Sequence, residues 1–285
     1  MQETGRGWLA LALVLSAGLA SLAGGAGQLA YALVVGLGLG LLHGASDLRL
    51  VAPGRRLVFL GCYLATALAC LLCWQLAGTA ALLLFLLLSA WHFAHEDELF
   101  PGRLTSLALG LFIIGGPALV HEAAVARLLA LAMGPAASLA LADWLARVLL
   151  LGGLLALPVL LLAVWQQRCP RLAVTLLAVV LAPPLVGFAL GFYLLHAAPQ
   201  TGARQRLLGA PTFKAYLRLT WPILLGAALF TLAGGLVFLL QERTGIRALF
   251  AVLAAFTVPH MLVLPRFLVS DAETQPRSGP QVVER

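Results

Sequence analysis

The chain has 285 residues, of which 62% are hydrophobic and only 10% are charged, and its mean hydropathy is +1.00. A soluble domain carries roughly 25% charged residues, so this composition excludes an ordinary soluble enzyme. The net charge of +7 comes from arginines and one lysine scattered between apolar runs. No basic run is long enough for a nucleic-acid interface, and the four cysteines show no disulfide or zinc pattern.

The sequence is almost entirely built from apolar runs that are long enough to cross a membrane. A crossing helix needs roughly 20 apolar residues. Lipid offers the backbone no hydrogen-bond partners, so continuous runs of this kind predict helices. We therefore expect an all-α, polytopic transmembrane helical bundle. In chain order, the clear runs are 8–24, 28–46, 57–76, 79–97, 104–121, 147–165, 172–197, 219–240 and 247–267.

A further run, 124–142, is ambiguous because it contains Arg127 and the pair Gly134-Pro135. With a cytoplasmic N-terminus, thirteen basic residues lie inside and five outside if this run crosses, but nine lie on each side if it does not. The positive-inside bias favours a crossing. The sequence thus predicts about ten spans, within a range of eight to ten. The first run resembles a signal peptide, and we expect it to be retained as the first helix.

The remaining organisation is simple. Residues 1–269 are predicted to form a single transmembrane domain, and the polar tail 270–285 is predicted to be disordered. The expected location is the inner cell membrane, with several passes.

Four histidines fall on four different predicted helices. With ten spans, His43, His92 and His196 reach the cytoplasmic side, and His260 lies in the inner half of the last span. Ionisable residues inside a membrane are rare and mark function. Four imidazoles at one depth predict a transition-metal site, for which Fe(II), Cu and Zn remain open.

The residues around these histidines suggest how the rings are held. Gly36, Gly40 and Gly44 form a small-residue stripe that lets a neighbouring helix approach the face carrying His43. Asp47 lies one turn after His43, where it could accept the second ring N–H. The remaining polar residues near helix ends are expected among lipid headgroups: His95, Glu96, Glu98 and His121.

At these histidines the chain resembles the Brp/Blh family of membrane-integral β-carotene 15,15'-dioxygenases. The similar stretches are "HGASD" at His43, "WHFAHED" at His92, "FYLLHAAPQ" at His196 and "VPHMLV" at His260, and they occur in the family's order. The resemblance implies an Fe(II) enzyme that uses O₂ to cleave the central double bond of β-carotene into two retinal molecules. It implies His43, His92 and His196 as iron ligands, with Asp47 and Asp97 orienting them from behind.

One departure from the family concerns the third motif. The family usually has a further ligand histidine four residues after His196, where this chain has Gln200. We expect Pro199 to prevent the helix from continuing and stacking Gln200 beneath His196. The departure leaves two outcomes: either His260 supplies the fourth nitrogen, or iron is lost or weakened and the chain is a divergent member with reduced or different activity.

An aromatic stripe is the candidate wall for a long polyene substrate. It comprises Phe188, Phe192, Tyr193 and Phe256. The expected partners are β-carotene, O₂ and the lipid bilayer, with a retinal-binding opsin as a further link.

The alternative function is a non-catalytic protein that binds carotenoid or retinal or assists an opsin, which Gln200 would favour. A haem carrier is disfavoured because no span carries two histidines about a dozen residues apart. A proton-coupled transporter is disfavoured because the carboxylates lie at span ends.

Overall fold

The computed structural model describes residues 2–100, 102–241 and 243–268; the tail 270–285 lies outside them. Of the described residues, 86% are helical and none is in a strand, so the all-α prediction is confirmed. In chain order the helices are α1 (Gln2–Leu22), α2 (Gly24–Tyr31), the π-helix η1 (Ala32–Leu39), α3 (Leu41–Gly44), α4 (Asp47–Leu50), the 3₁₀ turn η2 (Pro53–Arg55), α5 (Arg56–Leu76), α6 (Gly78–His95), α7 (Arg103–Gly115), α8 (Ala118–Met133), α9 (Leu139–Gln167), α10 (Pro170–Leu181), α11 (Pro184–Gly191), the π-helix η3 (Phe192–Ala197), α12 (Ala198–Leu207), α13 (Phe213–Leu239), α14 (Ile246–Leu262) and the 3₁₀ turn η4 (Leu264–Arg266).

The chain is a multi-pass membrane protein. Within the described residues, six stretches are long and apolar enough to cross a bilayer: Gly24–Leu50, Pro53–Leu76, Gly78–His95, Leu139–Gln167, Phe213–Leu239 and Ile246–Arg266. The pair α7 and α8, bent by 55°, makes a seventh if it is counted as one span. The predicted number of about ten is therefore not confirmed.

The first difference lies at the run 124–142, which does not form a helix of its own. Its first part belongs to α8 and its last residues to α9. Gly134 takes a φ of 98° after the end of α8, a conformation that suits glycine. Ser138 then caps α9, its side chain accepting a hydrogen bond from the amide of Leu141. Residues 103–133 form one bent path instead, broken at Gly116-Pro117.

The second difference lies at the run 172–197, where Pro183 and Pro184 separate α10 from α11. A proline pair cannot continue a helix, because it removes amide donors and pushes the preceding residue into extended backbone. The side-chain amide of Gln167, at the end of α9, donates to the backbone carbonyl of Leu99, and His196 lies beside His92. The chain between α9 and His196 thus leaves this end of the bundle and returns to it.

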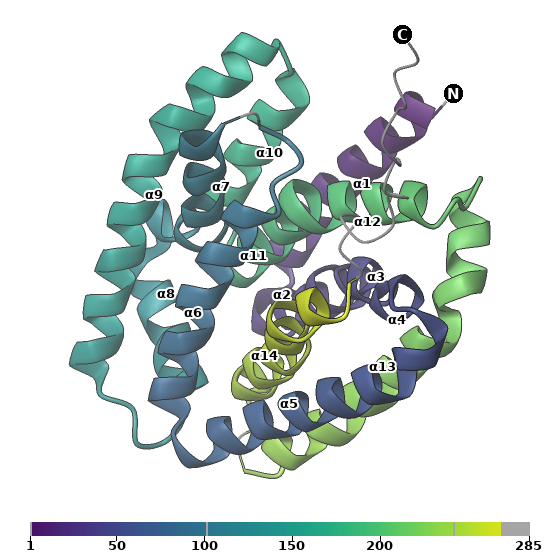
Figure 1. Ribbon diagram of the computed structural model, residues 1–285. Helices are drawn as coiled ribbons and strands as arrows, with labels where there is room; N and C mark the ends of the chain where they lie inside the picture. Colours follow the sequence, from purple (N-terminus) through teal and green to yellow (C-terminus); the bar gives the residue numbers. More distant parts are fainter. Residues whose placement is uncertain (1, 101, 242, 269–285) are drawn as a thin grey trace, which may run out of the picture.

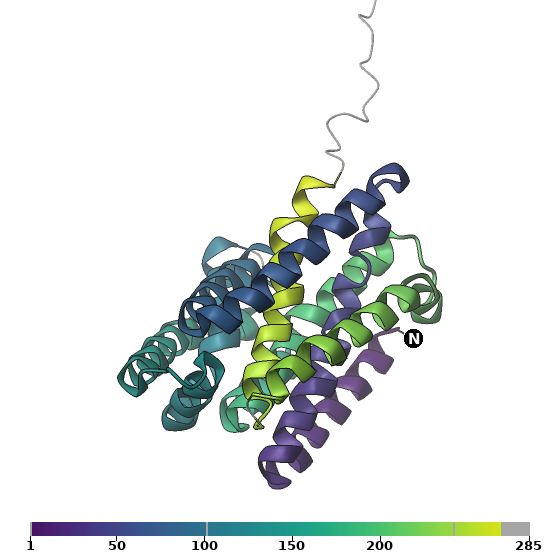
Figure 2. The ribbon, with the colours of Figure 1, turned by 90° about the horizontal axis from the view of Figure 1, so that it is seen from below.

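Helix α14 occupies the centre of the molecule, with α5 and α13 along one side and α6 to α9 on another (Figure 1). The most apolar window of its stretch is 72% buried, compared with 17% for that of α5 and 11% for that of α13. In the second view α14 runs alongside α5 through the bundle (Figure 2). Helix α14, which carries His260, is therefore surrounded mostly by protein. The neighbouring helices α5 and α13 face lipid, and they can form the outer wall of a cavity beside α14.

Candidate metal centre

Four imidazole rings meet in the interior of the bundle. His43 comes from α3, His92 from the last turn of α6, His196 from η3 and His260 from the last turn of α14. Their ring centroids form a closed circuit: 5.4 Å from His43 to His196, 4.8 Å from His196 to His92, 5.3 Å from His92 to His260 and 5.2 Å from His260 to His43. All four side chains are buried, being between 1% and 7% exposed. The structure thus brings together all four histidines that the sequence singled out.

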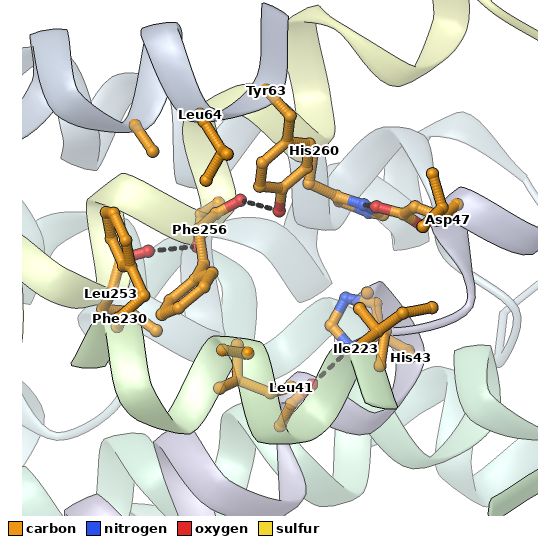
Figure 3. A pocket seen from close by; sticks show the side chains of 18 of the residues that line it. Leu41, His43, Asp47, Tyr63, Leu64, Ile223, Phe230, Leu253, Phe256 and His260 are labelled. Atoms are coloured by element: carbon orange, nitrogen blue, oxygen red, sulfur yellow. Dashed lines mark hydrogen bonds and ion pairs between the residues drawn. The ribbon is translucent and has the colours of Figure 1, made fainter. Parts of the chain in front are cut away.

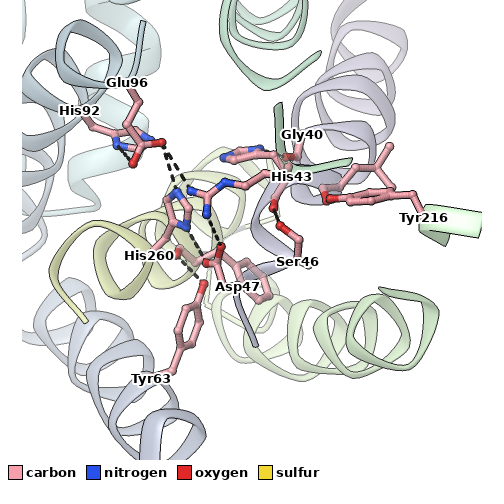
Figure 4. A network of polar contacts seen from close by, with 12 residues as sticks. Gly40, His43, Ser46, Asp47, Tyr63, His92, Glu96, Tyr216 and His260 are labelled. Carbon is pink, nitrogen blue, oxygen red and sulfur yellow. Dashed lines mark hydrogen bonds and ion pairs between the residues drawn. The ribbon is translucent and has the colours of Figure 1, made fainter. Parts of the chain in front are cut away.

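The hydrogen bonds of His43 and His260 leave a second ring nitrogen free on each. His43 Nδ1 lies 2.6 Å from the carbonyl oxygen of Gly40, and because a carbonyl only accepts, Nδ1 is the donor. His260 Nδ1 lies 2.5 Å from Asp47 Oδ2 (Figure 4). In the neutral form of each ring, Nε2 is then the unprotonated nitrogen, which is the form that binds a metal.

Unpaired buried nitrogens support a metal at this place. His196 has no hydrogen-bond partner at either ring nitrogen, and His260 has none at Nε2. Buried polar atoms without partners are rare in proteins, and a bound ion is one of the features that explain them. One nitrogen from each of His43, His92 and His196 lies within 4.8 Å of the others, close enough to share an ion. The residues therefore fit a nitrogen-rich transition-metal centre.

Asp47 and Asp97 have different surroundings. Asp47 contacts His260 rather than His43, its neighbour in sequence, because the ring of His43 donates to Gly40 instead. The Asp97 carboxylate accepts from the amides of Leu99 and Phe100 and from the hydroxyl of Ser106. These contacts order the loop before α7, and burial there raises the pKa of Asp97.

Two further charged residues belong to this site. Glu96 lies beside the rings, with its Oε1 3.8 Å from His92 Nδ1 and its Oε2 3.7 Å from His260 Nε2. Arg204 is buried between Glu96 Oε2, at 3.9 Å, and Asp47 Oδ1, at 4.0 Å. Burial alone would raise the pKa of Glu96, but the histidines and Arg204 hold it well below its usual range.

The placement of Glu96 among headgroups was therefore wrong, and the sequence analysis did not single out Arg204. A signal for both exists in their spacing. Glu96 follows His92 by four residues, and Arg204 follows His196 by eight with Gln200 midway, so each shares a helix face with a histidine.

The expectation that Pro199 ends the helix was also wrong. The backbone runs without a break from α11 through η3 into α12, with Pro199 in the first turn of α12. A π-helix shifts the hydrogen-bond pattern by one residue, and such a site can accommodate a proline that has no amide hydrogen. Gln200 is buried one turn after His196, and its Nε2 donates to the backbone carbonyl of Glu96.

A cavity of about 710 Å³ adjoins the imidazoles. His43, Asp47 and His260 lie at one side of it and Phe230 and Leu253 at the other (Figure 3). Its wall includes three leucines that are 40–59% exposed on the outside of the bundle: Leu60 and Leu64 of α5 and Leu229 of α13. The cavity therefore opens between α5 and α13, on the side of the protein that faces lipid.

The four candidate substrate-lining aromatics divide into two groups. Phe192 and Phe256 line the cavity. Phe188 stacks on Phe192 with a centroid distance of 6.1 Å. Neither Phe188 nor the buried Tyr193 is among the lining residues. Phe192 also stacks on His196 at 5.9 Å, and His196 itself is not among the residues that line the cavity.

Fold and site together define a class: a polytopic helical membrane protein with a buried polyhistidine centre at the end of a lipid-facing apolar cavity. Within that class, the family model described as Beta-carotene 15,15'-dioxygenase matches residues 34–267. The match spans most of the chain and includes all four histidines, so the chain belongs to this family, as the resemblance implied. The chain matches no curated protein and no solved structure.

Proposed function

We propose that the protein is an iron(II)-dependent oxygenase of the cell membrane that cleaves β-carotene at its central 15,15' double bond to give two molecules of retinal. The observation that carries this proposal is the meeting of four buried imidazoles, three of which line an apolar cavity that opens between α5 and α13. Family membership supports the reaction class. In this reaction the double bond breaks and each of its carbons takes one oxygen atom from O₂.

Four histidine side chains form the proposed iron-binding site. His43, His92, His196 and His260 would hold the ion, and the Asp47 carboxylate would fix the ring of His260 through Nδ1. A bound Fe(II) would supply the activation of O₂, which reacts slowly with an alkene on its own. The ligand rings are buried, so the protein keeps bulk water away from them.

The cavity provides the binding site for the polyene. Its lining is mostly apolar, which suits a hydrocarbon that needs no charged anchor. β-Carotene dissolves in the bilayer, so an opening between α5 and α13 lets it enter without passing through water. Phe192 and Phe256 would pack against the polyene next to the imidazoles.

The test compares two histidines of one helix. His92 belongs to the buried cluster, whereas His95, three residues later, is exposed and stacks on Trp91 at 5.2 Å. In β-carotene-producing cells, the unaltered protein and His95→Ala should bleach the yellow colour and accumulate retinal. His92→Ala should do neither and should purify with less iron. Retinal formation by His92→Ala at the unaltered rate would refute the proposal.

A non-catalytic carotenoid- or retinal-binding role, including service to an opsin, is the second candidate. It is favoured by Gln200, which replaces a ligand histidine of the family pattern. In that case the purified protein would carry intact carotenoid, and the cells would accumulate no retinal. The colour assay separates the two functions directly.

A further inference from the structure

Gln200, which stands where the family has a ligand histidine, makes a hydrogen bond to the backbone in this chain. Gln200 is 5% exposed, and its amide nitrogen donates to the backbone carbonyl of Glu96, at the C-terminal end of α6. This contact ties α12 to the end of α6 where Glu96 follows the last helical residue. The position that lacks an imidazole therefore contacts the backbone of the residue that carries the carboxylate nearest to the rings.

The carboxylate of Glu96 lies where a metal ligand would lie. Its oxygens are 3.8 Å from His92 Nδ1 and 3.7 Å from His260 Nε2, too long for hydrogen bonds. Two donors that each lie ~2.1 Å from one ion are ~3–3.5 Å apart, so both distances are close to those of neighbouring ligands. Oε2 is buried and has no hydrogen-bond partner. Donor atoms of His92, Glu96 and His260 lie within 4.8 Å of one another, as those of a metal-binding group do.

Arg204 fits the role of the group behind such a ligand. Its two terminal nitrogens face Glu96 Oε2 and Asp47 Oδ1 at 3.9 Å and 4.0 Å. Ligating carboxylates are themselves held by outer partners, and a buried guanidinium does this for both acids. Its positive charge also takes the place that a second metal ion would need between these two carboxylates, so the site suits a single ion.

We propose that Glu96 is an anionic metal ligand, which in this chain compensates for the imidazole missing at Gln200. The centre then combines imidazoles with one carboxylate instead of being formed by imidazoles alone. The inference rests on the metal centre of the proposed function and is independent of which substrate is cleaved.

A double-mutant cycle tests whether the contributions of Glu96 and residue 200 to metal binding are coupled. The full-length protein, purified in detergent, is loaded with Cu(II), whose EPR spectrum distinguishes oxygen from nitrogen ligands. Its affinity is measured by competition with a chelator. The four proteins are the unaltered chain, Glu96→Gln, Gln200→His and the double variant. Glu98→Gln is the matched control, because Glu98 is exposed and lies two residues after Glu96.

In the Gln200 background, we expect Glu96→Gln to lower affinity at least about 10-fold and to shift the EPR parameters toward fewer oxygen donors. In the Gln200→His background, the same change should have little effect, and this rescue also shows that the Glu96→Gln chain folds. Glu98→Gln should behave as the unaltered protein.

Equal affinity and an unchanged spectrum for Glu96→Gln would overturn the assignment of Glu96. Equal losses in both backgrounds would overturn the compensation. Absence of Cu(II) binding by the unaltered protein would instead refute the metal centre of the proposed function.

Discussion

Asp47 and His260 are 213 positions apart in sequence, yet their side chains are in contact. The ring of His260, and not that of His43, is therefore the imidazole that is hydrogen-bonded to Asp47. The 2.5 Å contact between Asp47 Oδ2 and His260 Nδ1 is buried. It fixes the tautomer that leaves Nε2 facing the other rings. Asp97 has an equally suggestive place in the sequence, after His92, but its oxygens are used by the loop before α7. Substitutions of Asp47 and of Asp97 are therefore expected to affect metal binding differently.

Asp47→Asn should weaken metal binding about 10- to 100-fold, because the ring of His260 loses the charged acceptor that orients it. The measurement is metal affinity of the purified protein by chelator competition. Asp97→Asn is the matched control: we expect it to leave the affinity unchanged and to lower the thermal stability of the protein. An equal loss of affinity in both variants would contradict the assignment of Asp47.

At this scale the sequence predicted the identity of the four clustered histidines but not their polar partners. Ionisable residues in apolar runs stand out because they are costly in lipid, so His43, His92, His196 and His260 could be selected without a structure. A partner on another helix depends on helix rotation and depth, which spacing along one chain does not reveal. Asp47 was therefore assigned to the nearest histidine, and Glu96 was placed among headgroups.

Among the elements, the segment from α2 to α4 shows how small residues make room for the site. The stripe Gly36, Gly40, Gly44 was predicted to allow close helix packing. A Cβ at Gly36 would lie 3.2 Å from the Cβ of Ala189 in α11. At Gly40 it would overlap the Gly36 carbonyl and the ring of Phe192, whereas at Gly44 it would meet nothing within 4 Å. Two positions of the stripe thus pack closely, and the third does not.

Gly40→Ala should destabilise the protein by about 1–3 kcal/mol, because the added methyl group would push the ring of Phe192 in η3 away from the end of η1. It should also reduce metal content, since the Gly40 carbonyl accepts the hydrogen bond from His43 Nδ1. The measurements are thermal unfolding in detergent and metal analysis. Gly44→Ala, four residues on, should change neither quantity. If both variants unfold alike, the close approach at Gly40 is not what the fold requires.

The path of the chain differs from the predicted spans at two of the apolar runs. Residues 124–142 form no helix of their own, and Pro183 and Pro184 interrupt the run 172–197. The four histidines nevertheless meet in the interior, although the path between them is not the predicted one. Hydropathy measures how apolar a run is, whereas the proline pair and the bend at Gly116-Pro117 decide where it turns.

In the molecule as a whole, the site depends on how the lipid-facing helices are arranged around the buried one. The central helix α14 provides His260, and exposed residues of α5 and α13 form part of the outer wall of the cavity next to it. Tyr63 of α5 donates a hydrogen bond to the carbonyl of Phe256 on α14, which fixes one side of the opening (Figure 3). Sequence could indicate an apolar substrate, but the position of its entrance follows from the helix arrangement.

Two glycines of α13 allow this entrance to be tested. Gly226 lines the cavity, and Gly235 does not; at both positions a Cβ would meet nothing within 4 Å. Gly226→Phe should fill the opening and strongly reduce both carotenoid binding and retinal formation, while metal content stays unchanged because no ligand moves. Gly235→Phe adds the same ring to the same helix and should leave all three quantities unchanged. Bound carotenoid is measured by absorbance of the purified protein, and retinal by chromatography of cell extracts. Unimpaired conversion by Gly226→Phe would mean that the polyene reaches the imidazoles by a route other than the gap between α5 and α13.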